Sequence, residues 1–256
     1  MIGFDDYKAI QSYSYSKLKA FLKSPLHGLT QKPFAETAAM RFGTATELIF
    51  KGQLEKIVLN PHEDGRTKAA KEFKLENAKR LVLTQSEMDR ALNCVSCLHA
   101  HPAVKSLHLQ FFNPDFRLQG TLAGLPLKGL SDWYLDGAIV DLKTTQSIDA
   151  GDFARTVDNF HYDLQAAVYC ELARQNGVEN PSFYWITVES EHPHDVAVYK
   201  ACERVIEVGN AKLRRALHNV KLANDGAFLG TSDAITTLAM PPWYGRKFED
   251  PYCLPE

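Results

Sequence analysis

The spacing of apolar positions changes in character along the chain. Through most of the first hundred residues they recur every three or four positions, which predicts amphipathic helices. From residue 105 they gather in short runs separated by turn residues, which predicts strands, and helical spacing returns later. The predicted helices are 14–24, 38–50, 69–80, 85–100, 152–176 and 203–224. The predicted strands are 57–59, 108–112, 116–122, 126–130, 132–135, 138–143, 182–189 and 194–199.

This mixture predicts an α/β fold with a mixed, mainly antiparallel central sheet flanked by helices. We expect the runs from 108 to 143 to form one meander of four or five strands. The 256 residues, 45% of them apolar, fit one domain with a large core. We therefore expect a single domain over 1–256, with an N-terminal helical segment at 1–30 and a C-terminal tail at 226–256.

Local signals predict where two of the helices begin. Ser14 or Ser16 can cap the first helix, and Pro25 should end it. Thr84 can cap the helix 85–100, and Glu87 stands at its third position. That spacing predicts a capping box, in which each of the two side chains accepts a hydrogen bond from the other residue's backbone.

The first predicted helix carries Lys17, Lys19 and Lys23 away from its apolar face. Two interpretations stay open, an ordinary solvated face and a helix that contacts phosphates. The net charge of −2 gives no overall basic signature. A nucleic-acid-binding role would therefore need a local basic patch.

Several classes of protein are disfavoured by what the sequence does not contain. It has no run of 18 apolar residues, so we expect no membrane span. The first ten residues lack a basic region followed by an apolar stretch, so we expect no signal peptide. Cys94 and Cys97 form a single C-x-x-C among five cysteines. Reduced thiols are favoured over a zinc or iron–sulfur site.

A predicted β-hairpin contains the strongest candidates for metal-binding and catalytic residues. An Asp-Gly pair at 136–137 lies between two apolar runs, which is a strong hairpin signal. Side chains alternate along a strand, so Asp141 and Lys143 should share one face and Leu142 the other. The returning strand can bring Asp141 near Asp132. Two carboxylates beside an ammonium would suit a divalent-metal site that hydrolyses phosphodiesters, although a solvated strand face offers the same pattern.

Three further residues stand out from their surroundings. Glu47 lies within an apolar helical stretch and needs a partner, because burying a lone carboxylate is costly. It can be a paired core residue or lie at a helix edge. Gln165 and Tyr169 are four residues apart and share one helical face. Such a pair can serve packing or a site.

Taken together in this order, the motifs resemble the PD-(D/E)xK nuclease superfamily, in its RecB/RecE-like exonuclease branch. Within that branch the chain is most similar to the exonuclease VIII (RecE) type and its phage relatives. The matching pieces are S-x-S-x-L-x-x-F-x-x-S-P at 14–25, F-G-T-A-x-x-L at 42–48, G-L-S-D at 129–132, D-L-K-T-T at 141–145, Y-D-L-Q-A-A-V-Y at 162–169 and L-A-M-P-P-W at 238–243. The resemblance implies a restriction-endonuclease-like core.

The resemblance also implies roles for individual residues. Asp132 and Asp141 would be metal ligands, with the main-chain carbonyl of Leu142 completing the inner sphere. Lys143 would orient the attacking water and stabilise charge on the phosphate. Glu47 stands where the family usually has a metal-site histidine, and it would serve as a ligand.

Further implied roles concern DNA. Gln165 and Tyr169 would brace the active site and contact the DNA strand. Ser16, Lys17 and Thr144 would also contact DNA. Leu130 departs from the pattern, because many relatives have a basic residue there.

The implied activity is that of a Mg²⁺- or Mn²⁺-dependent exodeoxyribonuclease. It would resect double-stranded DNA ends in the 5′→3′ direction for single-strand-annealing recombination. The implied partners are DNA ends, a single-strand-annealing protein and further copies of the chain in a ring. The implied setting is the cytoplasm of a bacterial host, with a phage or prophage gene.

Two alternatives remain open. One is a related nuclease of other polarity, or with single-strand or endonuclease activity. The chain lacks a cysteine set spaced for an iron–sulfur cluster, which argues against the cluster-bearing members. The other alternative is a catalytically decayed DNA-binding protein, for which Glu47 would be a sign of decay.

Overall fold

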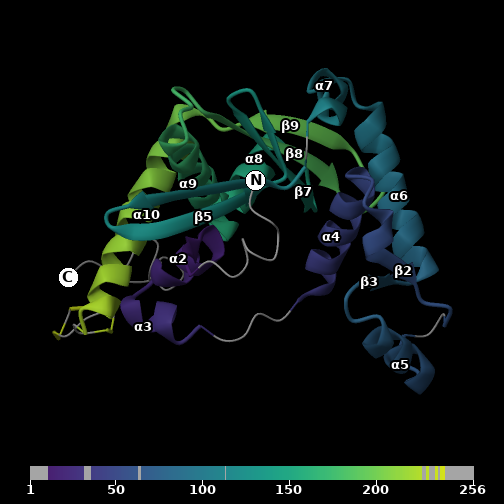
Figure 1. The fold of residues 1–256 in the computed structure, drawn as a ribbon, viewed down its shortest axis with the longest axis horizontal. Helices are drawn as coiled ribbons and strands as arrows, with labels where there is room; N and C mark the ends of the chain where they lie inside the picture. Colours follow the sequence, from purple (N-terminus) through teal and green to yellow (C-terminus); the bar gives the residue numbers. More distant parts are fainter. Residues whose placement is uncertain are drawn as a thin grey trace, which may run out of the picture.

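A four-stranded sheet crosses the middle of the fold (Figure 1). The computed structural model of the chain describes residues 11–31, 36–62, 65–112, 114–226, 229–230, 234–235 and 237–239. In order across the sheet, the strands are β6 (Trp133–Leu135), β7 (Ala138–Thr145), β8 (Ser182–Glu189) and β9 (Val196–Lys200). The central pair β7–β8 is parallel and the two outer pairs are antiparallel. The predicted α/β fold with a mixed, mainly antiparallel sheet is thereby confirmed.

Strand β7 is buried on both faces because its side chains alternate between two hydrophobic cores. Ile139 belongs to one core, and Val140 and Leu142 belong to the other. Apolar residues on both faces are typical of the interior strands of a sheet. The polar residues Asp141 and Lys143 lie on the same face as Ile139, which places them beside the first core.

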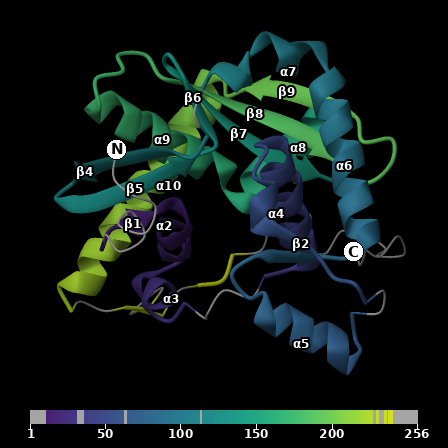
Figure 2. The same ribbon diagram turned by 45° about the vertical axis from the view of Figure 1, so that its right-hand side comes forward.

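Helices cover both faces of this sheet (Figures 1 and 2). The first core includes residues of α8, α9 and α10, and the second includes residues of α4 and α6. Figure 2 shows α6 running beside α4. The bounds of these helices are Ala150–Phe160 for α8, Tyr162–Gln175 for α9, Glu203–Asn224 for α10, Ala38–Phe50 for α4 and Gln85–Ala100 for α6.

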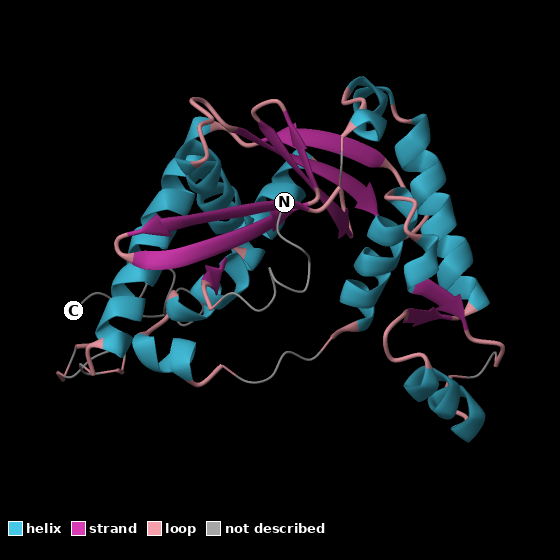
Figure 3. Ribbon diagram, viewed as in Figure 1, coloured by secondary structure: helices cyan, strands magenta, loops and turns pink. Residues whose placement is uncertain are grey.

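Smaller elements complete the described part of the chain (Figure 3). A second sheet has the order β1 (Tyr13–Ser14), β5 (Leu125–Ser131) and β4 (Phe116–Leu122), and a third pairs β2 (Ile57–Leu59) with β3 (Leu81–Leu83). The short helices are α2 (Tyr15–Phe21), α3 (Pro25–Leu29), α5 (Lys68–Glu76) and α7 (Pro102–Ser106), with 3-10 turns at Leu54–Lys56 and Leu109–Phe111.

The predicted helix starts are confirmed. Ser14 caps α2, where its hydroxyl oxygen accepts a hydrogen bond from the backbone of Lys17. Thr84 and Glu87 form the capping box of α6. Pro25 lies beyond the end of α2, and it also begins α3, since proline fits the first turn of a helix.

Three predictions about elements were wrong in detail. The expected strand 108–112 is a 3-10 turn, because Pro102 starts a short helix and His108 then turns the chain with a φ of 49°. The expected helix 152–176 is broken at His161, whose φ of 59° is left-handed. The expected single meander is divided between two sheets at Asp132, the bend between β5 and β6. Most of the expected tail 226–256 lies outside the described residues.

Candidate metal centre and active site

Asp115 and Asp132 face each other at the open end of the β4–β5 hairpin. Asp115 directly precedes β4 and Asp132 directly follows β5, and Phe116 pairs with Ser131. The amide of Asp115 donates a 3.0 Å hydrogen bond to the carbonyl of Asp132. Asp115 has a φ of 63°, a conformation that aspartate tolerates better than most residues. Antiparallel pairing therefore brings two carboxylates together.

The bend that presents Asp132 is fixed by the buried residue before it. The hydroxyl of Ser131 donates a 2.6 Å hydrogen bond to the carbonyl of Trp133. Oδ2 of Asp132 in turn accepts a 2.7 Å hydrogen bond from the amide of Leu142. The predicted hairpin thus brings Asp132 beside the segment that carries Asp141.

Helix α4 supplies a third carboxylate, Glu47. The helix packs closely on β7 because Gly43 faces Thr144: a Cβ on Gly43 would lie 3.2 Å from the Thr144 hydroxyl. Glu47, Asp115 and Asp132 each offer a carboxylate oxygen, and these oxygens lie within 4.8 Å of one another. Asp132 was expected here, and Glu47 is brought to it as predicted. Asp115 was not anticipated.

The ammonium of Lys51 occupies the middle of this group. Its distances to the carboxylate oxygens are 2.5 Å for Glu47, 2.7 Å for Asp115 and 2.8 Å for Asp132. The Lys51 side chain is 1% exposed, and its ammonium lies 5.3 Å from the centre of the Trp133 ring. The partner that Glu47 needs is thus Lys51, one helical turn further along.

The charges in this group shift one another's pKa values. Burial, and then the nearby charge of Asp132, raise the pKa of Glu47 to about 7. Burial alone would lower the pKa of Lys51, but Asp132 and Glu47 outweigh it and keep the ammonium charged. Burial would raise the pKa of Asp115, but the hydrogen bond and charge of Lys51 lower it. The group is therefore a set of carboxylates held together by one cation.

Asp141 forms a second group on the other side of Asp132. Its Oδ1 accepts a 2.7 Å hydrogen bond from the Gln165 amide, and its Oδ2 forms an ion pair with the Lys143 ammonium. Burial raises the pKa of Asp141 although Lys143 opposes the shift. The Lys143 ammonium also lies 4.9 Å from the centre of the Tyr162 ring. The predicted pairing of Asp141 with an ammonium on the same strand face is present.

Tyr169 braces the strand that leads to Asp132. Its hydroxyl donates a 2.9 Å hydrogen bond to the carbonyl of Leu130. Its ring lies on Gly129, where a Cβ would approach a ring carbon to 2.8 Å, so a side chain larger than glycine would displace the ring. Gln165 and Tyr169 are 5% and 6% exposed. The bracing role implied for them fits these contacts, and contact with DNA stays a prediction.

The remaining predicted residues are spread around the two groups. Ser16 and Lys17 are exposed on α2, and the Lys17 ammonium donates to the carbonyl of Ser12. Thr144 is half-buried against α4. At Leu142 the backbone amide contacts Asp132, and its carbonyl as a metal ligand stays a prediction.

A hard divalent cation fits the donor set of the first group. Mg²⁺ and Mn²⁺ prefer carboxylate oxygens, and Glu47, Asp115 and Asp132 offer three that converge. The Lys51 ammonium, itself a cation, lies where these three oxygens converge. Near Asp141, Oε1 of Gln165 is buried and has no hydrogen-bond partner among the described residues. We expect these three carboxylates to hold the ion. Asp141, which the resemblance implies as a ligand, is not among the three, and its role as a ligand stays a prediction.

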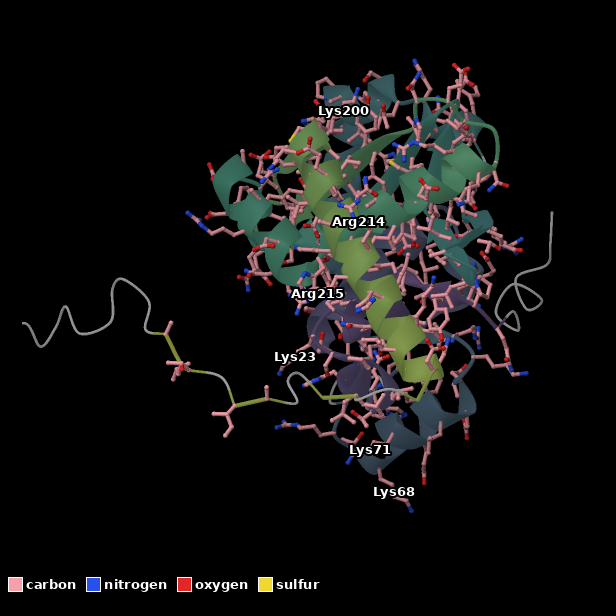
Figure 4. The ribbon with its side chains drawn as sticks, turned by 90° about the vertical axis from the view of Figure 1, so that its left-hand side faces the viewer. Lys23, Lys68, Lys71, Lys200, Arg214 and Arg215 are labelled. Atoms are coloured by element: carbon pink, nitrogen blue, oxygen red, sulfur yellow. The ribbon has the colours of Figure 1, made fainter. Side chains whose placement is uncertain are left out.

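Exposed basic side chains gather away from these groups. Lys23, Lys200, Arg214 and Arg215 are exposed, and Figure 4 shows them on the side of the molecule that α10 crosses. Exposed acidic residues of α10, Glu203 and Glu207, are also present, and a nucleic-acid-binding role for the basic side chains stays a prediction. Within the described residues, no helix is long and apolar enough to cross a membrane.

Comparisons with known proteins bear on the fold of the chain. A candidate exonuclease from Eubacterium rectale has a solved structure that superposes with a TM-score of 0.66 at 17% identity, covering 95% of this chain and 97% of that one. An alkaline exonuclease from Laribacter hongkongensis gives a TM-score of 0.31 at 10% identity, covering 70% and 94%. The first likeness supports the fold.

The family match covers most of the chain. No curated protein sequence matches it. The family model described as a PDDEXK-like domain of unknown function (DUF3799) matches residues 14–231. The resemblance to the PD-(D/E)xK superfamily is thus confirmed, while the RecB/RecE-like branch stays a prediction. The chain belongs to this family of PDDEXK-like domains, and its fold has a restriction-endonuclease-like core.

Proposed function

We propose that the protein is a Mg²⁺- or Mn²⁺-dependent deoxyribonuclease that degrades double-stranded DNA from its 5′ ends. The observation that carries the proposal is the position of Asp132 between the two groups of polar residues. One of its carboxylate oxygens belongs to the three-carboxylate group, and the other binds the backbone between Asp141 and Lys143. Asp132 thus links the three-carboxylate group to the buried pair of Asp141 and Lys143, within a PDDEXK-like fold.

The residues of the two groups would have different roles in the reaction. Glu47, Asp115 and Asp132 would hold a divalent ion, which supplies charge neutralisation and a more acidic water when bound. Gln165 fixes the orientation of Asp141 through their 2.7 Å hydrogen bond. The Lys143 ammonium, close to Asp141, is the group that can stabilise negative charge developing on a phosphate oxygen.

The finer parts of the proposal rest on the RecE-like motifs. The 5′→3′ direction, resection for single-strand annealing, a ring of several copies and an annealing partner protein are proposed on this resemblance. So is action in the bacterial cytoplasm from a phage or prophage gene. The exposed lysines and arginines on the α10 side support contact with nucleic acid.

One observation favours a second candidate function. Lys51 places an ammonium where the nuclease would place its metal ion. A protein in which this lysine had replaced the ion permanently would bind DNA without cutting it. The two candidates differ in a single property, metal-dependent cleavage.

A digestion assay separates them. Linear duplexes labelled at either the 5′ or the 3′ end are incubated with the protein in Mg²⁺, Mn²⁺ or EDTA. We expect early release of the 5′ label with metal and none with EDTA. Early release of the 3′ label would contradict the direction, and no release under any condition, with retained DNA binding, would favour the decayed protein. Asp132→Asn serves as the inactive control.

A further inference from the structure

Lys51 stands at the position that a divalent ion would occupy. Its ammonium lies 2.5–2.8 Å from one oxygen each of Glu47, Asp115 and Asp132. Divalent ions bind carboxylate oxygens at about 2.0–2.6 Å, so an ion bound by the same three oxygens would overlap the ammonium. The two cations cannot occupy the group together.

The balance of charge favours an incoming ion. The three carboxylates crowd their oxygens within 4.8 Å, and one ammonium offsets only a single charge. A divalent ion offsets twice as much, and it binds oxygen ligands more closely than an ammonium does. Lys51 therefore stabilises the metal-free group but leaves most of its charge uncompensated.

An adjoining cavity can take up the Lys51 side chain when it leaves the carboxylates. It caps the C-terminal end of α4, and the next residue, Gly52, leaves the helix with a φ of 71°, so its side chain can turn without breaking the helix. Lys51 lines a cavity of about 710 Å³, together with Trp133, His99 and Lys105. This cavity adjoins the three-carboxylate group, since Lys51 belongs to both.

We propose that Lys51 is a built-in counter-cation that exchanges with the divalent ion. Without metal, its ammonium fills the group of Glu47, Asp115 and Asp132. When the ion binds, the side chain turns into the adjoining cavity. This inference rests on the proposed function, and it adds that the protein carries its own competitor for the metal. The displaced ammonium then lies beside the metal centre, where an approaching phosphate can meet it.

The first test measures Mn²⁺ binding by calorimetry in the intact chain. We expect Lys51→Met to bind Mn²⁺ at least about tenfold more tightly than the wild type, because a competing cation is removed. Lys105→Met is the matched control, since it removes a lysine from the same cavity outside the described carboxylate group. Lys51→Gln, which can still hydrogen-bond the carboxylates, replaces Lys51→Met if that variant unfolds.

The second test uses the wild type and detects the movement itself. Amines are acetylated briefly with and without Mn²⁺, and the modified lysines are quantified by mass spectrometry. Lys51, 1% exposed without metal, should become several-fold more reactive with Mn²⁺. Lys68, 91% exposed, should not change. Only a displaced side chain gives this result, whereas a lysine that merely repels the ion from a fixed place stays protected.

The outcomes separate the inference from the function it rests on. If Mn²⁺ binds, but Lys51→Met binds it no more tightly and Lys51 stays protected, the exchange is refuted and the metal centre stands. If neither the wild type nor the Lys51 variants bind Mn²⁺, both the exchange and the proposed metal-dependent activity fall.

Discussion

The backbone amide of Leu142 donates a 2.7 Å hydrogen bond to Oδ2 of Asp132. The bond ties the bend after β5 to the middle of β7, and it leaves the other oxygen of Asp132 for the three-carboxylate group. Leu142 lies between Asp141 and Lys143 in the sequence, so the same short segment carries the second group. Asp132 thereby sets the position of one group relative to the other.

We expect Asp132→Asn to reduce cleavage by more than about 100-fold and to weaken Mn²⁺ binding, because it removes charge from a ligand that the site shares. Cleavage rates and calorimetry with Mn²⁺ measure both effects. Asp158→Asn is a matched control, since Asp158 is 77% exposed on α8 and pairs with Lys212. Unchanged Mn²⁺ affinity in Asp132→Asn would remove this residue from the metal site.

Asp115 is the residue that the motifs do not include. If it is a ligand, Asp115→Asn should weaken Mn²⁺ binding by about tenfold, a loss comparable to other changes around metal ligands. If it only holds Lys51, the Mn²⁺ affinity should stay the same or rise, since the competing ammonium is held less firmly. Calorimetry on this single variant decides between the two roles.

Variants of the Asp141–Lys143 pair should change the unfolding free energy and kcat independently of each other. Lys143→Met leaves a buried carboxylate without its cation, so it should destabilise the protein by about 3–5 kcal/mol and lower kcat, while Mn²⁺ still binds. Lys143→Met combined with Asp141→Asn should recover most of the stability, because no charge is left unpaired, without recovering kcat. Urea unfolding and turnover measure the two. Recovery of kcat in the double variant would mean that Lys143 acts only structurally.

The sequence predicts the second group better than the first. The turn at 136–137 and the alternation along β7 are local signals, and they are enough to place Asp141 and Lys143 on one face with Leu142 on the other. The family motifs add Asp132 and Glu47. These residues depend on short-range geometry or on a pattern that the whole family shares.

Asp115 and Lys51 could not be found in the same way. Asp115 meets Asp132 only because β4 and β5 pair with Phe116 opposite Ser131, and the register of a hairpin is not fixed by its apolar pattern alone. Lys51 is one turn from Glu47, which suggests a pair, but its contacts with Asp115 and Asp132 depend on how α4 docks on the sheet. The break of the predicted helix at His161 has no clear signal, since a left-handed histidine replaces the expected glycine.

Tyr169→Phe tests whether this residue braces the site or contacts DNA. The variant loses the hydrogen bond to the carbonyl of Leu130, which should cost about 1 kcal/mol of unfolding free energy. If the hydroxyl only braces β5, kcat should fall modestly and KM for DNA should stay the same. A rise in KM with unchanged stability would instead assign the hydroxyl to DNA contact.

The raised pKa of Glu47 predicts how the metal-free protein responds to pH. In the unfolded chain Glu47 has its ordinary value of 4.5, and in the fold the pKa is about 7. Between these values the folded state binds more protons than the unfolded state, so the unfolding free energy should fall as pH rises from about 4.5 to 7 and level off above. The side chain is 34% exposed, and solvent therefore moderates the size of the effect.

Glu47→Gln isolates this contribution. The pKa of Asp141 is also raised, so this residue too makes the unfolding free energy fall as the pH rises. It does so in both proteins, and only the difference between their two curves therefore belongs to Glu47. Urea unfolding in EDTA, measured from pH 5 to pH 8, should give a shallower decline for Glu47→Gln, with the two curves closest at the acid end, where Glu47 is already protonated. Mn²⁺ should flatten the decline of the wild type more than that of the variant, because the ion favours the ionised carboxylate that it binds. Parallel curves in EDTA would show that Glu47 ionises in the fold as it does in the unfolded chain.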